Sequence, residues 1–284
     1  MAEQQPQSIV DRTIDRIHAD NQLKEAGFVM SSPHCHPHYE IFYIESGHSS
    51  YFVGSGVYEL HAGDLLIMPP DVFHFTRYPA ACRRSNVFFR EGDLTDEIRA
   101  LMPGGRRFFD EPRILQVPEG YREQIAGLFS GMAREEKISD ERTPLLLRAM
   151  LHELLLLCGR ECAYLDGMPE DIHTTDMPIV RAARFMSSHY MDDISTADIA
   201  AEAGYSPNYL TRKFREAAGI GVHEYLTFIR LQRAALELVS TDHTVTEIAF
   251  RCGFSDGNYF KDAFKKKYGV TPRAYRKRPP EHIV

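Results

Sequence analysis

The chain has 284 residues, which is enough for one large domain or two domains of ordinary size. With 43% hydrophobic and 26% charged residues it can bury a core, so an intrinsically disordered chain is excluded. The net charge of −7 hides an asymmetry, because residues 206–278 alone carry a net charge of +7. A protein that is acidic overall can therefore still bind a polyanion through its C-terminal third.

The sequence gives no sign of membrane insertion, secretion or disulfide bonding. Its longest apolar stretch, Leu145 to Cys158, is shorter than the ~20 residues that span a bilayer. The N-terminus lacks the apolar core of a secretory signal, and the five widely spaced cysteines indicate reduced thiols. We therefore expect a cytoplasmic protein that makes no contact with a membrane.

The N-terminal half is predicted to begin with an amphipathic helix over residues 8–26 and to continue as short strands. Runs rich in Tyr, Phe, Ile and Val are separated by Gly, Ser, Pro and Asp, a pattern typical of an antiparallel sandwich or barrel. The predicted strands are Tyr39–Glu45, Tyr51–Val53, Leu65–Met68 and Asn86–Arg90. A helical region is expected to follow, from about Gly120 to Tyr164.

Four residues that can bind a metal or a ligand alternate along the segment 33–47. They are His34, His36, His38 and Glu40. If this segment is a strand, all four point to one of its faces. A predicted turn at Pro69–Asp71 would return a later strand, with His74, to the same place. Such polar side chains inside a barrel are costly unless they meet a metal, a ligand or ordered water, so we expect a site here.

These residues resemble the two sequence motifs of the cupin family. Gly27, the alternating histidines and Gly47 match the first motif, and Gly63 through His74 match most of the second. The second motif departs from the pattern at Asp71, where glycine is usual, and at Tyr78, where asparagine is usual. In metal-binding cupins the matching positions supply three imidazoles and a carboxylate, a donor set that suits iron, manganese, nickel or zinc. The metal ligands implied here are His34, His36, Glu40 and His74.

Two interpretations of this cluster stay open. In the first, the cluster holds a divalent metal as cofactor or effector. In the second, the same four residues line a pocket for an organic effector such as a sugar or an aromatic compound, together with Tyr43. Histidines without any role in a site would bury several polar groups without partners, which is unfavourable.

The segment 144–165 predicts a helix with more apolar surface than one contact with a barrel requires. Between Leu145 and Cys158, 11 of 14 positions are apolar. The excess indicates a second partner, most simply the same helix of another subunit about a twofold axis. The alternative is a helix wedged between the barrel and neighbouring helices. Charged residues in place of Leu151 and Leu155 should then either give a monomer or unfold the domain.

The C-terminal third contains an internal repeat. IAAEAGYS begins at Ile199 and IAFRCGFS begins 49 residues later at Ile248, and the same order of apolar, Phe, Gly and Tyr positions follows each. Each copy predicts a short helix, a glycine turn, and a second helix that Ser206 or Ser255 caps. Between the copies, residues 222–239 predict one helix of ~27 Å. This length suits two recognition helices placed about one DNA turn, ~34 Å, apart.

The run from Ile199 to Arg276 resembles the DNA-binding domain of AraC/XylS-type transcription regulators. The resemblance rests on the paired IA-x3-G-[YF]-S cores, on Arg230-x2-Arg233-Ala234 and on the closing GVTPRAYR. In that family the second helix of each copy reads the major groove, and the sensor is a cupin-like barrel. The implied DNA-contacting residues are Asn208, Thr211, Arg212 and Arg215 in the first copy, and Gly257, Asn258, Lys261, Asp262, Lys265 and Lys266 in the second.

The second copy departs from a common pattern of the family at Asp262, a position where arginine is frequent. A carboxylate cannot donate to guanine, but it can accept a hydrogen bond from cytosine N4, or it can repel phosphate. We therefore expect the second helix to specify sequence less strongly and its lysines to contact mainly phosphates.

The resemblance implies an α+β multidomain protein. It would consist of a cupin-like, jelly-roll type β-barrel with helices at 1–165 for effector binding and dimerisation, a linker at 166–176, and an all-α DNA-binding domain at 177–284. The helix-turn-helix motifs are expected at about 196–217 and 245–268. The implied partners are double-stranded promoter DNA, a small-molecule effector, a second subunit and, for an activator, RNA polymerase. A metal-responsive regulator and a metal-dependent cupin enzyme are the alternatives. We expect no enzyme, because the chain carries no nucleotide-binding or nucleophile motif.

Overall fold

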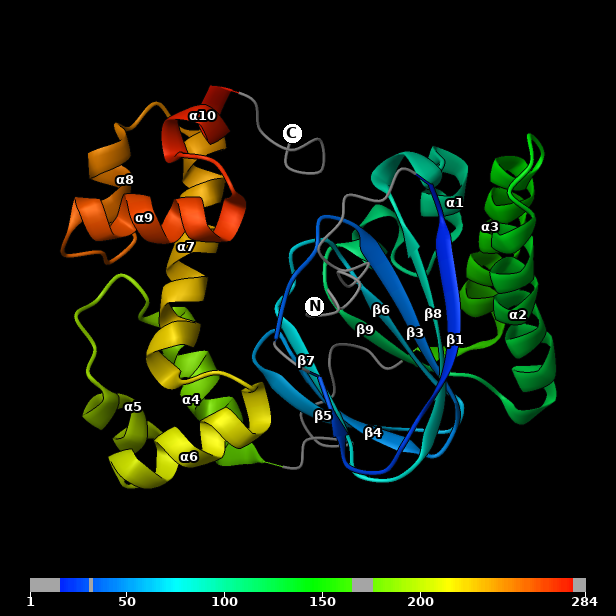
Figure 1. The fold of residues 1–284 in the computed structure, drawn as a ribbon, viewed down its shortest axis with the longest axis horizontal. Coiled ribbons are helices and arrows are strands. Elements are labelled where there is room, and N and C mark those ends of the chain that lie inside the picture. The colour runs from blue at the N-terminus through cyan, green and yellow to red at the C-terminus, as the bar shows by residue number, and fades with distance from the viewer. Residues whose placement is uncertain (1–15, 31–32, 165–175, 278–284) are drawn as a thin grey trace, which may run out of the picture. The chain divides into compact units, whose positions relative to one another are not determined.

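A computed structural model describes residues 16–30, 33–164 and 176–277, and these residues form two compact units that divide after residue 175. The first unit holds two β-sheets and several helices, and the second unit holds helices α4 to α10 (Figure 1). The expected α+β class, with a β-rich N-terminal part and a helical C-terminal part, is therefore confirmed. Among the described helices, none combines the length and the apolar character needed to cross a membrane.

The two sheets of the first unit are antiparallel and enclose the barrel interior between them. The six-stranded sheet has the order β1 (His18–Lys24), β8 (Cys82–Phe89), β3 (Tyr39–Ser46), β6 (Asp64–Met68), β9 (Arg113–Gln116) and β10 (Ala163–Tyr164). The four-stranded sheet has the order β2 (Phe28–Val29), β7 (His74–Tyr78), β4 (His48–Val53) and β5 (Gly56–His61). All four predicted strands are present, as β3, β4, β6 and β8.

The helix predicted over residues 8–26 is wrong in its second half, where β1 pairs with β8 along its whole length. Ala19 belongs to the core under the helices, whereas Asp20 and Gln22 bond to Arg84 on the opposite side of the sheet. This alternation has the period of a strand and not that of a helix. Residues 8–15 of the prediction lie outside the described ranges.

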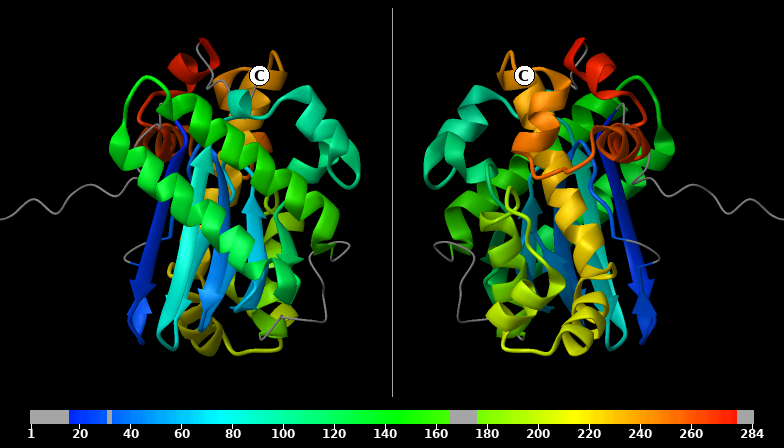
Figure 2. Two further views of the ribbon diagram at one scale, coloured as in Figure 1. Left: turned by 90° about the vertical axis from the view of Figure 1, so that its right-hand side faces the viewer. Right: turned by 90° about the vertical axis from the view of Figure 1, so that its left-hand side faces the viewer.

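Helices α2 (Arg122–Ile138) and α3 (Thr143–Glu161) cover the outer face of the six-stranded sheet (Figure 2, left). They confirm the predicted helical region, except that its last residues, Ala163 and Tyr164, form strand β10. The shorter elements of this unit are η2 (Glu91–Asp93), α1 (Asp96–Leu101), η3 (Gly105–Phe109) and η4 (Glu119–Tyr121).

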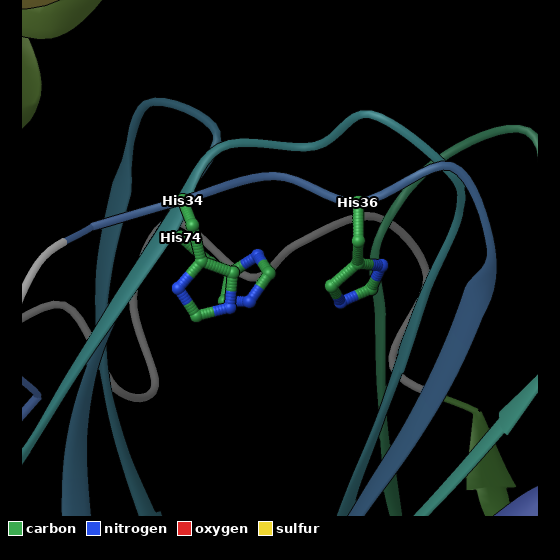
Figure 3. A group of neighbouring side chains, drawn as sticks. All are labelled: His34, His36 and His74. Carbon is green, nitrogen blue, oxygen red and sulfur yellow. The ribbon is translucent and has the colours of Figure 1, made fainter. Parts of the chain in front are cut away.

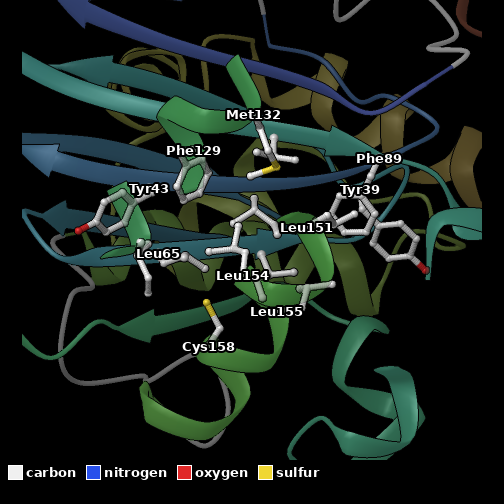
Figure 4. Packing of buried hydrophobic residues seen from close by; sticks show 14 of the residues in the cluster. Tyr39, Tyr43, Leu65, Phe89, Phe129, Met132, Leu151, Leu154, Leu155 and Cys158 are labelled. Carbon is white, nitrogen blue, oxygen red and sulfur yellow. The ribbon is translucent and has the colours of Figure 1, made fainter. Parts of the chain in front are cut away.

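The apolar residues of α3 divide between a buried face and an exposed face. Leu151 and Leu155 are completely buried in the core that joins α2, α3 and the sheet (Figure 4). In contrast, Leu145 keeps 70% of its surface exposed, and Leu146 and Leu156 keep 42% and 40%. Of the two predicted outcomes of charged residues at 151 and 155, the structure therefore supports unfolding. The unpartnered apolar face of α3 lies at the exposed leucines.

Tyr43 was expected in the effector site but lies on the other face of β3. Its ring stacks on Phe129 of α2 with 5.6 Å between ring centroids, and Ile41 points to the same side. Glu40 and Phe42 point into the barrel interior instead. Because successive residues of a strand face opposite sides, residues 40 and 43 cannot share a face. The assignment of Tyr43 to the effector site is thus wrong.

The second unit contains the predicted pair of helix-turn-helix motifs. Its helices are α4 (Met177–Ser188), α5 (Thr196–Ala203), α6 (Pro207–Ala218), α7 (Val222–Ser240), α8 (Val245–Arg251), α9 (Gly257–Tyr268) and α10 (Pro272–Lys277). Helix α7 confirms the predicted connecting helix to within one residue. The first helix of each motif begins with a capping box, formed by Ser195 in one copy and Thr244 in the other.

The predicted caps of the recognition helices need correction. Ser206 occupies the N-cap of α6, but its side chain makes no capping hydrogen bond. In the second copy Asp256, not Ser255, is the N-cap, and its carboxylate accepts from the backbone N–H groups of Asn258 and Tyr259. The extra residue of the second copy explains the difference, because it shifts the start of α9 by one position.

Candidate functional site

Three histidines meet at one end of the barrel interior. One ring nitrogen of His34, one of His36 and one of His74 lie within 4.8 Å of one another (Figure 3). The backbones of His34 and His74 exchange two hydrogen bonds, of 3.2 and 3.0 Å, and this bridge brings the two cupin-like motifs together. The strand itself starts only at Tyr39, so a shared strand face is not what gathers the histidines. His38 stacks on the ring of His36, with ring centroids 4.1 Å apart.

Backbone carbonyls fix how two of these rings are protonated. His36 Nδ1 donates to the carbonyl of His38 and His74 Nδ1 donates to that of Val72, both at 2.9 Å. A carbonyl oxygen can only accept, so both Nδ1 atoms carry a proton. The Nε2 atoms are left to face the Glu40 carboxylate, at 3.1 Å from His36 and 3.7 Å from His74. In metal sites, bonds of this kind from one ring nitrogen to a carbonyl orient the imidazole so that its other nitrogen can bind the metal.

The surroundings lower the pKa of both Glu40 and His74. Burial alone would raise the pKa of Glu40, but the hydrogen bond from His36 and the nearby His74 hold it below its usual value. Burial, followed by the charge of His34, lowers the pKa of His74 well below its usual value. Three imidazoles and a carboxylate this close together form a donor set that fits a divalent transition metal.

A second group of buried polar residues extends from this cluster along β8. Asn86 donates to Glu40 Oε1 at 2.6 Å, and two residues earlier Arg84 forms an ion pair with Asp20 of β1. Arg84 also donates to Gln22 at 3.2 Å. In the described part of the chain, Arg84 Nε and Asn86 Oδ1 are buried without a hydrogen-bond partner. These atoms offer one donor and one acceptor to a molecule in the barrel interior.

The sequence prediction missed this second group. Residues 83–86 of β8 are all polar, and the period of two of a strand places Arg84 and Asn86 on the same face, which is the signal that marks them. Asp20 lies in the segment that was predicted to be a helix, so its ion pair with Arg84 on the neighbouring strand could not be predicted. Burial raises the pKa of Asp20, and its ion pair with Arg84 opposes that effect.

Asp71, at the glycine position of the second cupin motif, adopts the conformation that glycine normally provides. Its φ is +61°, and its N–H donates to the carbonyl of His36 at 2.8 Å, so this turn holds the histidine segment. Aspartate tolerates this left-handed region better than most residues. The departure from the motif is therefore compatible with the same turn.

We expect Asp71→Gly to leave the stability of the first unit nearly unchanged and Asp71→Val to lower it by about 1–2 kcal/mol. A β-branched side chain is strained at positive φ, whereas glycine is not. Urea unfolding followed by tyrosine fluorescence measures both variants. Equal stability of the Gly and Val variants would contradict the strained turn.

The two recognition helices, α6 and α9, are built alike. Leu210 and Phe214 of α6, and Phe260 and Phe264 of α9, are completely buried. All DNA-contacting residues expected on the opposite faces are exposed apart from Gly257, which is half-buried at the start of α9. They are Asn208, Thr211, Arg212, Arg215, Asn258, Lys261, Asp262, Lys265 and Lys266. Each helix thus has one polar, exposed face and one apolar, buried face, as a helix that enters a major groove requires.

Local contacts orient three of the expected DNA-contacting side chains of α6 in the absence of DNA. The guanidinium of Arg212 lies over the Tyr209 ring, 5.1 Å from its centroid. The Thr211 hydroxyl donates to the carbonyl of Pro207 at 2.9 Å, and Arg215 pairs with Glu224 of α7 at 3.5 Å. Arg212 is therefore the cation of α6 that stacks on a ring, whereas Lys213 and Arg215 pair with carboxylates.

Two exposed tyrosines belong to the same faces and were not predicted. Tyr209 and Tyr259 occupy equivalent positions 50 residues apart and are 39% and 55% exposed. Their conservation of place within the internal repeat is the signal that marks them. A phenol in this position can donate to a phosphate or pack on a sugar.

Comparison with known proteins gives two family matches. Residues 23–155 match the model of the AraC-like ligand binding domain, and residues 199–278 match that of a helix-turn-helix domain. The chain is 23% identical over 258 residues to the HTH-type transcriptional activator RhaS of Enterobacter sp. (strain 638), covering 90% of each protein. It is also 23% identical over 249 residues to RhaS of Escherichia coli O81 (strain ED1a), covering 86% of each.

Solved structures with similarity to the chain fall into two groups. One is the C-terminal domain of AraT, a response regulator from Geobacillus stearothermophilus, with 36% identity and a TM-score of 0.34 over 36% of this chain and 84% of that chain. Another is ToxT from Vibrio cholerae, with 15% identity and a TM-score of 0.37 over 92% of this chain and 98% of that chain.

Proposed function

The chain belongs to the AraC family of DNA-binding transcription regulators with a ligand-binding domain, and from this premise we propose how its residues divide the work. Helices α6 and α9 bind promoter DNA, and a molecule bound inside the N-terminal barrel controls that binding. The observation that carries the proposal is the duplicated motif, in which both recognition helices expose cations and amides over a buried aromatic base. The protein is a regulator and not an enzyme.

The two recognition helices have different roles in this proposal. Arg212, stacked on Tyr209, reads a guanine through two hydrogen bonds. In α9, the carboxylate of Asp262 lies among the exposed Lys261, Lys265 and Lys266, so this helix contacts phosphates more than bases. The first motif therefore contributes more to sequence specificity, and the second contributes more to affinity.

We expect Arg212→Ala to weaken binding to a specific duplex by about 1–3 kcal/mol while binding to random DNA changes little. The duplex is enriched from a randomised pool by the wild-type chain, and binding is measured by fluorescence anisotropy. Lys266→Ala serves as the matched control, because it should weaken specific and random DNA alike and lower the salt slope by about one charge. Equal losses on both duplexes for Arg212→Ala would show that Arg212 contacts only phosphate.

The effector site of this proposal is the cluster of His34, His36, Glu40 and His74, extended by Arg84 and Asn86. Its support is the convergence of buried polar atoms from both sheets on one end of the barrel interior. An organic effector would satisfy the donor and the acceptor of β8 that lack partners.

A divalent metal is a second candidate for the same cluster. The observation that favours it is that the Nδ1–H groups of His36 and His74 donate hydrogen bonds to backbone carbonyls, while the Nε2 atoms of both rings face Glu40. A metal at that place would use His34, His36, His74 and Glu40 as ligands and would supply a fixed positive charge. Metal analysis of protein purified without an affinity tag distinguishes this candidate from the organic effector.

We further propose a homodimer that forms through α3. Leu145, Leu146 and Leu156 expose an apolar stripe on the side of this helix that faces away from the sheet. A twofold axis would cover the stripe with its own copy. We also infer that the protein is an activator, in line with the names of its relatives. We propose in addition that it acts in the cytoplasm and contacts RNA polymerase.

A further inference from the structure

The pair Arg230 and Arg233 on the connecting helix α7 has no part in the functions described so far. Both arginines face the turn that joins α4 to α5, just before the first helix-turn-helix motif. Arg230 Nε donates to the carbonyl of Tyr190 at 2.7 Å, and its Nη2 donates to the carbonyl of Asp192 at 2.8 Å. The guanidinium of Arg233 lies 5.6 Å from the centroid of the Tyr190 ring. One side chain of α7 thus binds two carbonyls of this turn, two residues apart.

The second helix-turn-helix motif touches the same turn through Gly253. This glycine lies between α8 and α9 with a φ of +83°. A Cβ added here would overlap the carbonyl oxygen of Tyr190 and would lie 2.8 Å from Arg230 Nε. The turn of the second motif therefore packs directly on the turn that precedes the first. Only glycine permits both the close approach and this backbone conformation.

These contacts join the two motifs beyond the covalent connection through α7. The turn at residues 189–193 is attached to the first motif, because it leads directly into α5. Gly253 is part of the second motif, between α8 and α9. Arg230 lies between them and satisfies the carbonyl oxygen on which Gly253 packs. A helix of 19 residues can bend, and a lateral contact of this kind restrains the bending.

We propose that Arg230 is a positioning residue that fixes the spacing and angle between the two recognition helices. The proposal rests on the proposed function, in which α6 and α9 read two sites on one duplex. Arg230 does not touch the DNA in this proposal, and its effect passes through the turn and Gly253. A guanidinium is needed because its planar fork reaches two carbonyls, whereas an ammonium is a point charge on a flexible stem.

A rigid spacing makes binding sensitive to the distance between the two sites on the DNA. One added base pair moves the second site by about 3.4 Å along the axis and by about 35° around it. A rigid pair of motifs then loses one of its two contacts. A flexible pair can still reach both sites, but it binds the correct spacing more weakly because its effective concentration is lower.

The test measures the DNA affinity of the full chain. The reference DNA is the duplex that the wild-type protein enriches from a randomised pool. It is compared with variants of that duplex that carry one or two extra base pairs between the two sites. We expect the wild type to lose about tenfold or more in affinity on each altered spacing. Arg230→Lys keeps the charge and should lose about threefold or less on the altered spacings, while it binds the original duplex more weakly. A duplex with only the first site should bind both proteins equally.

Arg251→Lys is the matched control. Arg251 pairs with Glu237 of α7 at 3.0 Å, so the same substitution disturbs one contact between α8 and α7 and keeps both bonds of Arg230 to the carbonyls of the turn. This variant should keep the spacing dependence of the wild type. Circular dichroism melting establishes that each variant is folded. If Arg230→Lys does not fold, one glycine inserted between Asp192 and Asp193 displaces the same carbonyls and should produce the same tolerance.

The outcomes separate this proposal from the one on which it rests. If the wild type enriches no duplex, the proposed function fails. If it enriches a two-site duplex, and folded Arg230→Lys or the lengthened turn keeps the spacing dependence of the wild type, the positioning role of Arg230 is overturned. If Arg251→Lys gains the same tolerance as Arg230→Lys, the role is also overturned, because the effect is then not specific to the turn.

Discussion

Leu151→Asp is expected to unfold the N-terminal unit rather than to separate subunits. Leu151 is completely buried between α2 and the sheet, in the same core as Phe129 and Leu155. Removing a buried leucine side chain costs about 2–5 kcal/mol, and an unpaired buried carboxylate adds to this cost. The sum approaches the whole stability of a domain, which is about 5–15 kcal/mol. Circular dichroism and urea unfolding should show a lost or strongly shifted transition.

The double variant Leu145→Glu/Leu156→Glu is the matched control on the same helix. Both leucines are exposed, so the folded unit should lose little stability. If α3 forms the dimer interface, charges of like sign would face each other across the twofold axis, and the variant should be a monomer by light scattering. A wild type that is monomeric at micromolar concentration would contradict the dimer. A folded Leu151→Asp would contradict the packing of α3.

The helix-turn-helix unit could be predicted closely from the sequence because its signals are local. The first helices of the two motifs, α5 and α8, begin at the predicted residues Thr196 and Val245, and α7 differs from the prediction by one residue. Glycine turns, caps and an apolar period of 3.6 lie within a few residues of one another. The internal repeat then supplied a second, independent copy of each signal. The cap of α9 was missed because the inserted residue moves the N-cap from Ser255 to Asp256.

The barrel was harder to predict because its contacts are distant in the sequence. The strand at residues 18–24 acquires its structure from pairing with β8, whose partner residues lie 58 to 70 positions later, and its own composition resembles that of a surface helix. Strand β5 was also missed, because it is a short segment between turns, whereas the later strand expected with His74 is present as β7. Tyr43 was assigned to the wrong face of its strand, because it lies three residues after Glu40 and an odd separation places two strand residues on opposite faces. The histidines were predicted correctly as residues that meet, although a backbone bridge and not a strand face brings them together.

His36→Ala/His74→Ala should leave the protein folded and able to bind DNA but remove its response to the effector. Both imidazoles are buried beside Glu40 in the first unit, and neither belongs to the helices that would contact DNA. The probes are divalent zinc, manganese, iron and nickel, each alone, and a panel of sugars and aromatic acids. A ligand at 100 times its Kd stabilises the folded state by about 2.7 kcal/mol and raises the melting temperature.

The expected result is a shift of several degrees for the wild type with one probe and no shift for the double variant with the same probe. His48→Ala/His61→Ala is the matched control, because these two histidines form a separate pair on β4 and β5, with ring centroids 5.8 Å apart. It should keep the wild-type shift. Anisotropy on the enriched duplex should show that the probe changes DNA affinity for the wild type and for this control, but not for His36→Ala/His74→Ala. An effector can change DNA affinity only if it binds more tightly to one conformation of the chain than to the other. An unchanged response midpoint in the cluster variant would therefore mean that the histidines do not bind the effector and are structural.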